Sequence, residues 1–131
     1  MSTTDRATDQ ALVVDDSSAM RMILSRIMKS LGFEVHNAAN GREALTALDD
    51  APGIRIALVD WNMPVMDGVE FVRSVRSSGQ HPDLKLLMVS SESDLDRVQT
   101  ALDAGADEYA MKPFDVGIIR DKLEILGLVG A

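Results

Sequence analysis

Two hydrophobic periods alternate along the chain. Short segments rich in apolar or β-branched residues, as in β-strands, occur five times, at Ala11–Val14, Glu34–Ala38, Ile56–Val59, Leu84–Val89 and Glu108–Met111. The stretches between them have helical spacing, most clearly where apolar side chains line one face of the segment from Met20 to Leu31. The pattern therefore predicts a β-strand followed by an α-helix, repeated five times.

The residues at the ends of the helical stretches agree with this order. Asn40 and Asp67 each stand three residues before a glutamate, which is the spacing of a capping box at a helix N-terminus. Gly32, Gly79 and Gly105 each follow a helical stretch, where a left-handed residue commonly ends a helix. These signals predict helix boundaries at the places where the hydrophobic period changes.

The alternation of strands and helices also predicts the kind of sheet. Strands that are separated by helices of this length run parallel and are joined by right-handed crossovers. The segment Leu84–Val89 is apolar except for Lys85, which indicates a strand buried on both faces. We therefore predict an α/β fold with a five-stranded, parallel, doubly wound sheet in a three-layer sandwich. Five units are too few to close a barrel of eight strands.

The composition narrows the possible partners and sites. The 131 residues carry 21 acidic and 13 basic side chains, and the net charge of −8 repels nucleic-acid backbones and anionic lipids. The absence of cysteine excludes disulfides and thiolate metal sites. The chain has no run of 18 apolar residues that could span a membrane, and the polar residues 1–10 do not form a secretory signal. We expect a disordered lead over 1–10, one domain over 11–131, and a soluble, cytoplasmic protein.

Polar side chains follow four of the five predicted strands. Asp15 and Asp16 come after the first strand, Asp60 after the third, Ser90 after the fourth and Lys112 after the fifth. Each of them alone could be a helix cap, a turn hydroxyl or a surface charge. In an open parallel sheet, however, ligands bind beyond the carboxyl ends of the strands, so we expect these side chains to share one site.

The chemistry of these residue types is that of phosphoryl transfer with a metal ion. Three neighbouring carboxylates repel one another and suit Mg²⁺, a cation that prefers oxygen ligands. A carboxylate can also act as a nucleophile and form an aspartyl phosphate, while a lysine and a hydroxyl hold the other phosphoryl oxygens. Asp60, on the central strand, is the predicted nucleophile, and Asp15 and Asp16 are left to bind Mg²⁺. Asp67 is predicted to be only a helix cap, and no organic cofactor is expected.

Four motifs, VVDDSSAMR, LVDWNMPVMDG, LLMVSSES and EYAMKPF, follow one another along the chain. With them the chain, from about Ala11 to Leu126, resembles the receiver domain of bacterial two-component response regulators, most closely the stand-alone, CheY-like chemotaxis type. The resemblance implies a flavodoxin-like (βα)5 fold and a switch that a histidine kinase or a histidine phosphotransfer protein phosphorylates. It implies no metabolic enzyme, because a receiver catalyses only its own phosphorylation and autodephosphorylation.

The resemblance also implies roles for single residues around the metal. Asp60 matches the phosphoacceptor and is a metal ligand. Asp16 matches the direct Mg²⁺ ligand, Asp15 the ligand that often acts through water, and the main-chain carbonyl of Asn62 the third protein ligand. The peptide bond before Pro113 is expected to be cis.

The remaining roles concern the phosphoryl group and the output. Lys112 matches the lysine that pairs with the phosphate, and Ser90 and Tyr109 match the hydroxyl and aromatic switch residues. The expected output surface comprises the fourth helix, the fifth strand and the fifth helix, around 95–104 and 109–126. A downstream protein is expected to bind there, and neither nucleic acid nor membrane is an expected partner.

Other readings compete with this one. A haloacid-dehalogenase-like phosphohydrolase would have a D-x-D arrangement at the first strand, where this chain has adjacent Asp15 and Asp16. A flavodoxin-like electron carrier would need a phosphate loop after the first strand, where this chain has Asp15 and Asp16. It would also need aromatic side chains to stack on the flavin, and only Trp61 and Tyr109 could do so. We read Trp61 as a surface aromatic over the pocket. A phosphorelay intermediate, or a receiver cut from a longer regulator, stays open as an alternative.

Overall fold

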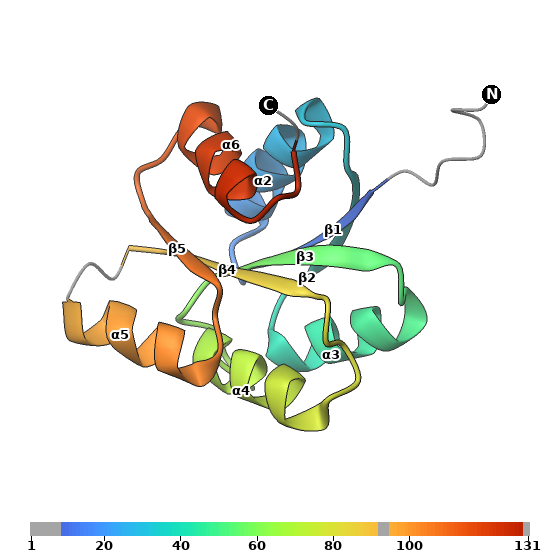
Figure 1. Ribbon diagram of the computed structural model, residues 1–131, viewed down its shortest axis with the longest axis vertical. Coiled ribbons are helices and arrows are strands. Elements are labelled where there is room, and N and C mark those ends of the chain that lie inside the picture. Colours follow the sequence, from blue (N-terminus) through green and yellow to red (C-terminus); the bar gives the residue numbers. More distant parts are fainter. Residues whose placement is uncertain (1–8, 92–94, 130–131) are drawn as a thin grey trace.

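Strands and helices alternate along the whole described chain, as the hydrophobic pattern predicts (Figure 1). The computed structural model describes residues 9–91 and 95–129. Its elements are β1 (Gln10–Val14), α2 (Ser18–Ser30), β2 (Glu34–Ala38), α3 (Gly41–Asp50), β3 (Ile54–Val59), α4 (Gly68–Ser78), β4 (Lys85–Ser90), α5 (Leu95–Ala104), β5 (Glu108–Met111) and α6 (Val116–Ile125).

The strands form one parallel sheet in the order β2-β1-β3-β4-β5. Helices α2 and α6 cover one face of the sheet, and α3, α4 and α5 cover the other (Figure 1). The predicted three-layer, doubly wound α/β sandwich is therefore confirmed. The chain leaves β1 toward β2 on one side and continues from β3 toward β5 on the other, so the strand order reverses between β1 and β3. Ligands of such sheets bind at this switch point, beyond the carboxyl ends of the strands.

The boundaries of β2 and β5 are as predicted, and those of the other three strands differ by one or two residues. β1 begins at Gln10, which pairs with both neighbouring strands, and β3 begins at Ile54 rather than Ile56. Ser90 is the last residue of β4 and not the first residue after it, because it still pairs with Met111 of β5. Of the lead expected over 1–10, residues 1–8 lie outside the described part of the chain.

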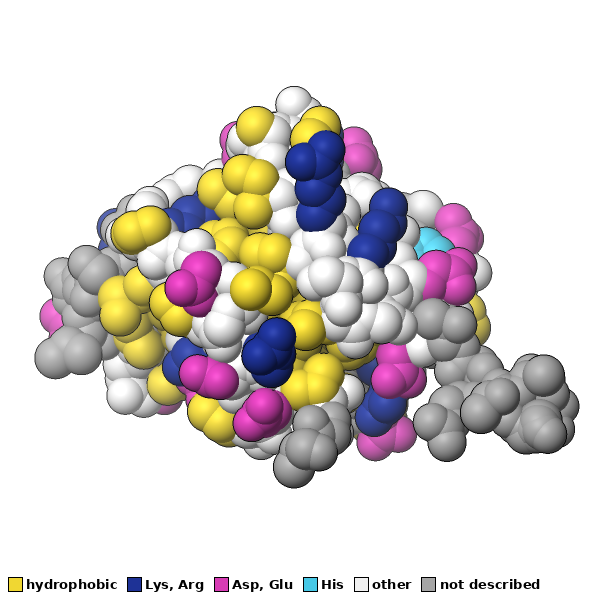
Figure 2. All heavy atoms as spheres, turned by 90° about the horizontal axis from the view of Figure 1, so that it is seen from above, with side chains coloured by type: hydrophobic (Ala, Val, Ile, Leu, Met, Phe, Trp, Pro, Cys, Tyr) yellow, Lys and Arg dark blue, Asp and Glu magenta, His cyan; other side chains and the backbone are white. Residues whose placement is uncertain are grey.

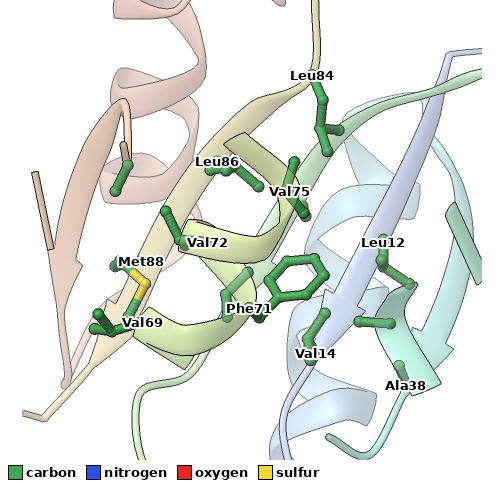
Figure 3. Packing of buried hydrophobic residues seen from close by; sticks show 14 of the residues in the cluster. Leu12, Val14, Ala38, Val69, Phe71, Val72, Val75, Leu84, Leu86 and Met88 are labelled. Atoms are coloured by element: carbon green, nitrogen blue, oxygen red, sulfur yellow. The ribbon is translucent and has the colours of Figure 1, made fainter. Parts of the chain in front are cut away.

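Apolar side chains fill the space on both sides of the sheet. Along β3 the buried side chains alternate, with Ile56 and Leu58 in the cluster under α2 and α6, and Ala57 and Val59 in the cluster under α3, α4 and α5. Figure 3 shows the second cluster, in which Phe71 of α4 lies against the sheet. Both clusters exclude water from the strands, and the strand ends are thereby held at fixed positions relative to one another.

The helix boundaries are fixed largely by the predicted caps. Asn40 accepts a hydrogen bond from the Glu43 backbone N–H at 2.9 Å. Asp67 and Glu70 form a complete capping box at the start of α4. The three glycines predicted to end helices all have positive φ, at 97° for Gly32, 66° for Gly79 and 119° for Gly105. Asp67 is thus a helix cap, as predicted.

Within the described residues, no helix is long and apolar enough to cross a lipid bilayer.

Candidate functional site

Three carboxylates meet at the switch point of the sheet. Asp15 and Asp16 follow β1 and Asp60 follows β3, and Val14 and Val59 are register partners at the ends of these two strands. One carboxylate oxygen of each aspartate lies within 4.8 Å of those of the other two, a spacing that could hold a metal ion. The sequence predicted this cluster correctly, since adjacent parallel strands deliver their C-terminal residues to the same place.

Lys112, which follows β5, reaches the same cluster. Its Nζ lies 3.3 Å from Asp15 Oδ2 and 3.4 Å from Asp60 Oδ1. The peptide bond between Lys112 and Pro113 is cis, as the resemblance implied. The lysine therefore neutralises part of the charge of two neighbouring carboxylates.

Asp15 is buried and held by the backbone around it. Its N–H donates to the Ala38 carbonyl at 3.1 Å, and its Oδ1 accepts from the Ser17 N–H at 2.9 Å. The Arg21 side chain donates to the Asp15 carbonyl at 2.6 Å. Asp15 is only 1% exposed, whereas Asp16 is exposed to solvent. The two acids thus present one fixed, buried carboxylate and one accessible carboxylate to the site.

Asp60 is positioned by the loop that follows β3. Its N–H donates to the Val14 carbonyl at 2.9 Å, and its carboxylate accepts a hydrogen bond from the Trp61 backbone N–H. The Gly68 N–H then donates to the Trp61 carbonyl at 2.9 Å, which ties the start of α4 to the strand end. The local sequence therefore fixes the carboxylate through main-chain contacts on both sides.

The surroundings of Asp60 disfavour its negative charge. Burial raises the pKa of the Asp60 carboxyl from its usual value of 3.8, and the nearby Asp15 charge raises it further. The Lys112 ammonium and the Trp61 N–H oppose this rise but do not cancel it. Lys112 therefore does not fully balance the neighbouring carboxylates, and a bound cation would stabilise the ionised form of Asp60.

This pKa shift predicts a pH-dependent effect of Asp60→Asn on stability. Because folding raises the pKa of Asp60, its favourable contribution is fully present below about pH 3.8 and is lost as the pH rises through the folded value. Asparagine does not titrate. We expect the free energy of unfolding of Asp60→Asn, relative to the unaltered protein, to increase as the pH rises from about 4 toward neutrality. Urea unfolding in metal-free buffers measures this; a difference that falls with rising pH would contradict the charge balance described for the site.

The two predicted switch residues are both buried. Ser90 is fully buried at the end of β4, and its carbonyl accepts from the Lys112 N–H at 2.9 Å. Tyr109 is a buried residue of β5, next to Met88 of β4 in the ladder. The fold thus places Ser90 beside the end of β5, the strand that contains Tyr109 and precedes Lys112, and the switching role of both residues stays a prediction. Asn62 is an exposed residue of the loop after Asp60, and the metal-binding role of its carbonyl also stays a prediction.

The prediction that Trp61 is a surface aromatic is wrong. Its side chain belongs to the core cluster under α3, α4 and α5, and only 8% of the residue is exposed. The guanidinium of Arg97, on α5, lies 5.3 Å from the centroid of its ring. Burial of the large apolar area of an indole stabilises the fold, and the arginine covers part of the ring surface that is still exposed.

Sequence reasoning missed Arg21 and Gly68 as parts of the site. Arg21 lies six residues after Asp15, and the first turns of α2 bring it back over the end of β1. Gly68 is at the start of α4, where an added Cβ would clash with the Asp60 carbonyl and lie 3.1 Å from the Trp61 Cα. The Asp-Gly pair that ends LVDWNMPVMDG signalled a helix start, but it also marks this close approach of two backbones.

We expect Gly68→Ala to destabilise the protein by about 1–3 kcal/mol, because the added methyl group would displace the Asp60 backbone. Alanine is otherwise the better helix former, so a helix without this contact would be stabilised. The control is Gly53→Ala, whose added Cβ would meet only the flexible end of the Gln10 side chain, at 3.0 Å. Urea unfolding compares the two variants; a Gly68→Ala protein as stable as the Gly53→Ala protein would argue against the contact.

The model of the response regulator receiver domain family matches residues 11–124. Chemotaxis protein CheY1 of Helicobacter pylori is 40% identical over 116 residues, which cover 88% of this chain and 94% of the relative. A chemotaxis protein CheY homolog of Campylobacter jejuni is 41% identical over 118 residues, 88% of this chain and 91% of the relative.

Solved structures agree with these matches. Chemotaxis protein CheY4 of Vibrio cholerae superimposes with a TM-score of 0.85 at 35% identity, over 92% of this chain and 99% of the other. The CheX–CheY–BeF3–Mg complex from Borrelia burgdorferi matches with a TM-score of 0.82 at 28% identity, over 89% of this chain and 88% of the other.

Proposed function

The chain belongs to the response regulator receiver domain family and is a two-component response regulator, and we propose that Asp60 accepts its phosphoryl group in a Mg²⁺-dependent reaction. One observation carries the proposal: the carboxylates of Asp15, Asp16 and Asp60 converge within 4.8 Å beside the Lys112 ammonium. The same residues are the ones that the family resemblance assigns to this chemistry.

The donor set of the cluster fits Mg²⁺. It consists of carboxylate oxygens, and Mg²⁺ binds oxygen ligands while keeping several waters. Asp16, which is exposed, and Asp60 would bind the ion directly with the main-chain carbonyl of Asn62, and the buried Asp15 would act through water. When bound, the ion would offset the carboxylate repulsion and polarise a phosphoryl oxygen.

The protein's own groups would then perform the transfer. An oxygen of the ionised Asp60 carboxylate attacks the phosphorus of a phosphohistidine in line with the P–N bond. The new O–P bond forms as the P–N bond breaks, the P–N electron pair goes to the imidazole, and the ring leaves neutral because its other nitrogen already carries a proton. The Trp61 N–H holds the Asp60 carboxylate in place, while Lys112 and the Ser90 hydroxyl stabilise the charge on the phosphoryl oxygens. The signal ends when water attacks the phosphorus of the acyl phosphate, which releases inorganic phosphate and restores the Asp60 carboxylate.

The proposed output is a contact between proteins. Phosphorylation would bias an equilibrium in which Ser90 and Tyr109 move together. The expected output surface, around 95–104 and 109–126, is formed by α5, β5 and α6. It carries the exposed apolar side chains Leu102 and Met111, which are 38% and 49% exposed. A downstream target protein would bind this face.

The other helical face also exposes apolar side chains. Figure 2 looks onto the layer of α2 and α6, where hydrophobic side chains gather among charged ones. The exposed members are Met22 and Ile23 on α2, and Val116, Ile118 and Ile125 on α6, which also belongs to the output face. We assign the part of this surface on α2 to the donor, a histidine kinase or a histidine phosphotransfer protein.

We propose chemotaxis as the process. The relatives from Helicobacter pylori and Campylobacter jejuni are both named as chemotaxis proteins and are matched over more than nine tenths of their length. The CheY of Borrelia burgdorferi was crystallised with BeF3, Mg²⁺ and CheX, which supports an acyl phosphate signal and a partner of that kind here.

The proposal is tested with the purified protein and a small phosphodonor such as acetyl phosphate. We expect Mg²⁺ to produce an adduct of one phosphoryl group in the intact mass spectrum, and EDTA to prevent it. An adduct that forms equally well with EDTA would contradict the role of the metal, and no adduct under either condition would contradict the proposed chemistry.

A further inference from the structure

A cation from α5 lies over the aromatic ring next to the proposed phosphoacceptor. The Arg97 guanidinium is 5.3 Å from the centroid of the Trp61 ring, within the range of a cation–π interaction. Trp61 is buried and Arg97 is exposed, so the arginine covers the ring from the solvent side. Arg97 has no direct part in the proposed phosphoryl transfer.

The backbone of Trp61 is part of the site. Its N–H donates to the Asp60 carboxylate, and its carbonyl accepts from the Gly68 N–H at 2.9 Å. A buried indole packed in the core has little freedom to move without its own backbone. The position of the indole therefore bears on the hydrogen bond that orients the Asp60 carboxylate.

We propose that Arg97 is a positioning residue for the phosphoryl chemistry at Asp60, acting through Trp61 from helix α5. The inference rests on the proposed function of Asp60. Arg97 holds the indole, the indole fixes the Trp61 amide, and the amide orients the attacking carboxylate. A displacement of α5 that withdraws Arg97 would loosen this chain of contacts.

A partner bound to the output face would act on the site through Arg97. Helix α5 is part of the face on which the target protein would bind. A partner that engages the Arg97 guanidinium with an acidic side chain would take it from the Trp61 ring, because a charged pair competes with the cation–π contact. Occupation of the output face would then change the rate at which Asp60 gains its phosphoryl group.

The test compares Arg97→Gln, Arg97→Lys and, as a matched control, Arg73→Gln, which removes the same charge from an exposed position of α4. The rate of phosphorylation by acetyl phosphate and Mg²⁺ is measured for each, with the fluorescence of Trp61, the single tryptophan of the chain. The free energy of an exposed cation–π contact corresponds to a change of about two- to fivefold in the phosphorylation rate. We expect Arg97→Gln to shift the emission of Trp61 and to slow phosphorylation by that factor, Arg97→Lys to restore part of the rate, and Arg73→Gln to behave as the unaltered protein.

A double-mutant cycle separates this role from a general effect on the fold. In a Trp61→Leu background, Arg97→Gln should no longer change the phosphorylation rate. Equal slowing by Arg97→Gln and Arg73→Gln, an unchanged rate in Arg97→Gln, or an undiminished effect without Trp61 would each overturn the role of Arg97. An unaltered protein that takes no phosphoryl group overturns the proposed function itself, and is thereby distinguished from a failure of this inference alone.

Discussion

Asp60→Asn is expected to abolish the Mg²⁺-dependent phosphoryl adduct while the protein stays folded. Asparagine has nearly the same shape as aspartate but lacks the ionised oxygen that attacks phosphorus. It also removes one of the three carboxylates that converge within 4.8 Å, so the affinity for Mg²⁺ should fall as well. The rate of adduct formation with acetyl phosphate, followed by intact mass, measures the first effect, and a Mg²⁺ titration of Trp61 fluorescence measures the second.

The matched control for this experiment lies in the same stretch of sequence. Asp67 is the N-cap of α4 and accepts from the Glu70 N–H at 2.8 Å, and asparagine is an equally good N-cap. Asp67→Asn should therefore be phosphorylated like the unaltered protein. If Asp60→Asn retained the adduct, or if Asp67→Asn lost it, the division of roles between the two aspartates would be wrong.

The second large effect is expected for Lys112→Ala. The lysine Nζ lies 3.3 Å and 3.4 Å from carboxylate oxygens of Asp15 and Asp60, and it is the cation that would meet the phosphoryl oxygens in the transition state. Removing one group of this kind lowers the rate of an enzyme about 100- to 1,000-fold. We expect a loss of that order in the rate of phosphorylation by acetyl phosphate at saturating Mg²⁺.

Stability provides a second measure of the same substitution. Without Lys112, the carboxyl groups of the buried Asp15 and of Asp60 lose a neighbouring cation, so the metal-free protein should be destabilised. Mg²⁺ should restore much of this loss, since it would supply the missing charge. The control is Lys122→Ala, which breaks a partly exposed pair with Glu108 at 3.1 Å and should affect neither the rate nor the response to Mg²⁺. A Lys112→Ala protein with an unchanged phosphorylation rate would remove Lys112 from the proposed mechanism.

The sequence predicted most of the fold because its local signals agree with one another. The apolar alternation along β3, the capping box at Asp67 and the left-handed glycine at position 79 each specify an element or its end within a few residues. The sequence predicted the ends of the strands less accurately, because pairing with the neighbouring strand, rather than composition, decides where a strand ends. Ser90 is polar, yet it extends β4 because Met111 of β5 lies opposite.

The sequence also predicted which carboxylates meet, because parallel strands deliver their C-terminal residues to one edge of the sheet. It did not predict the contacts that depend on three-dimensional packing. Trp61 follows a charged residue in a loop and reads as exposed, but α5 covers it and Arg97 lies over its ring. The role of Arg21 at Asp15, and the close approach of Gly68 to the Asp60 backbone, likewise depend on distances that no periodicity encodes.

If Asp60 is the residue that carries the phosphoryl group, the group can be located on it directly. The protein is incubated with acetyl phosphate and Mg²⁺, the acyl phosphate is reduced with borohydride, and the modified residue is identified by peptide mass spectrometry. We predict that the modification is found at Asp60, and that it is absent when EDTA replaces Mg²⁺. Modification at Asp15, Asp16 or another residue in place of Asp60 would contradict the assignment.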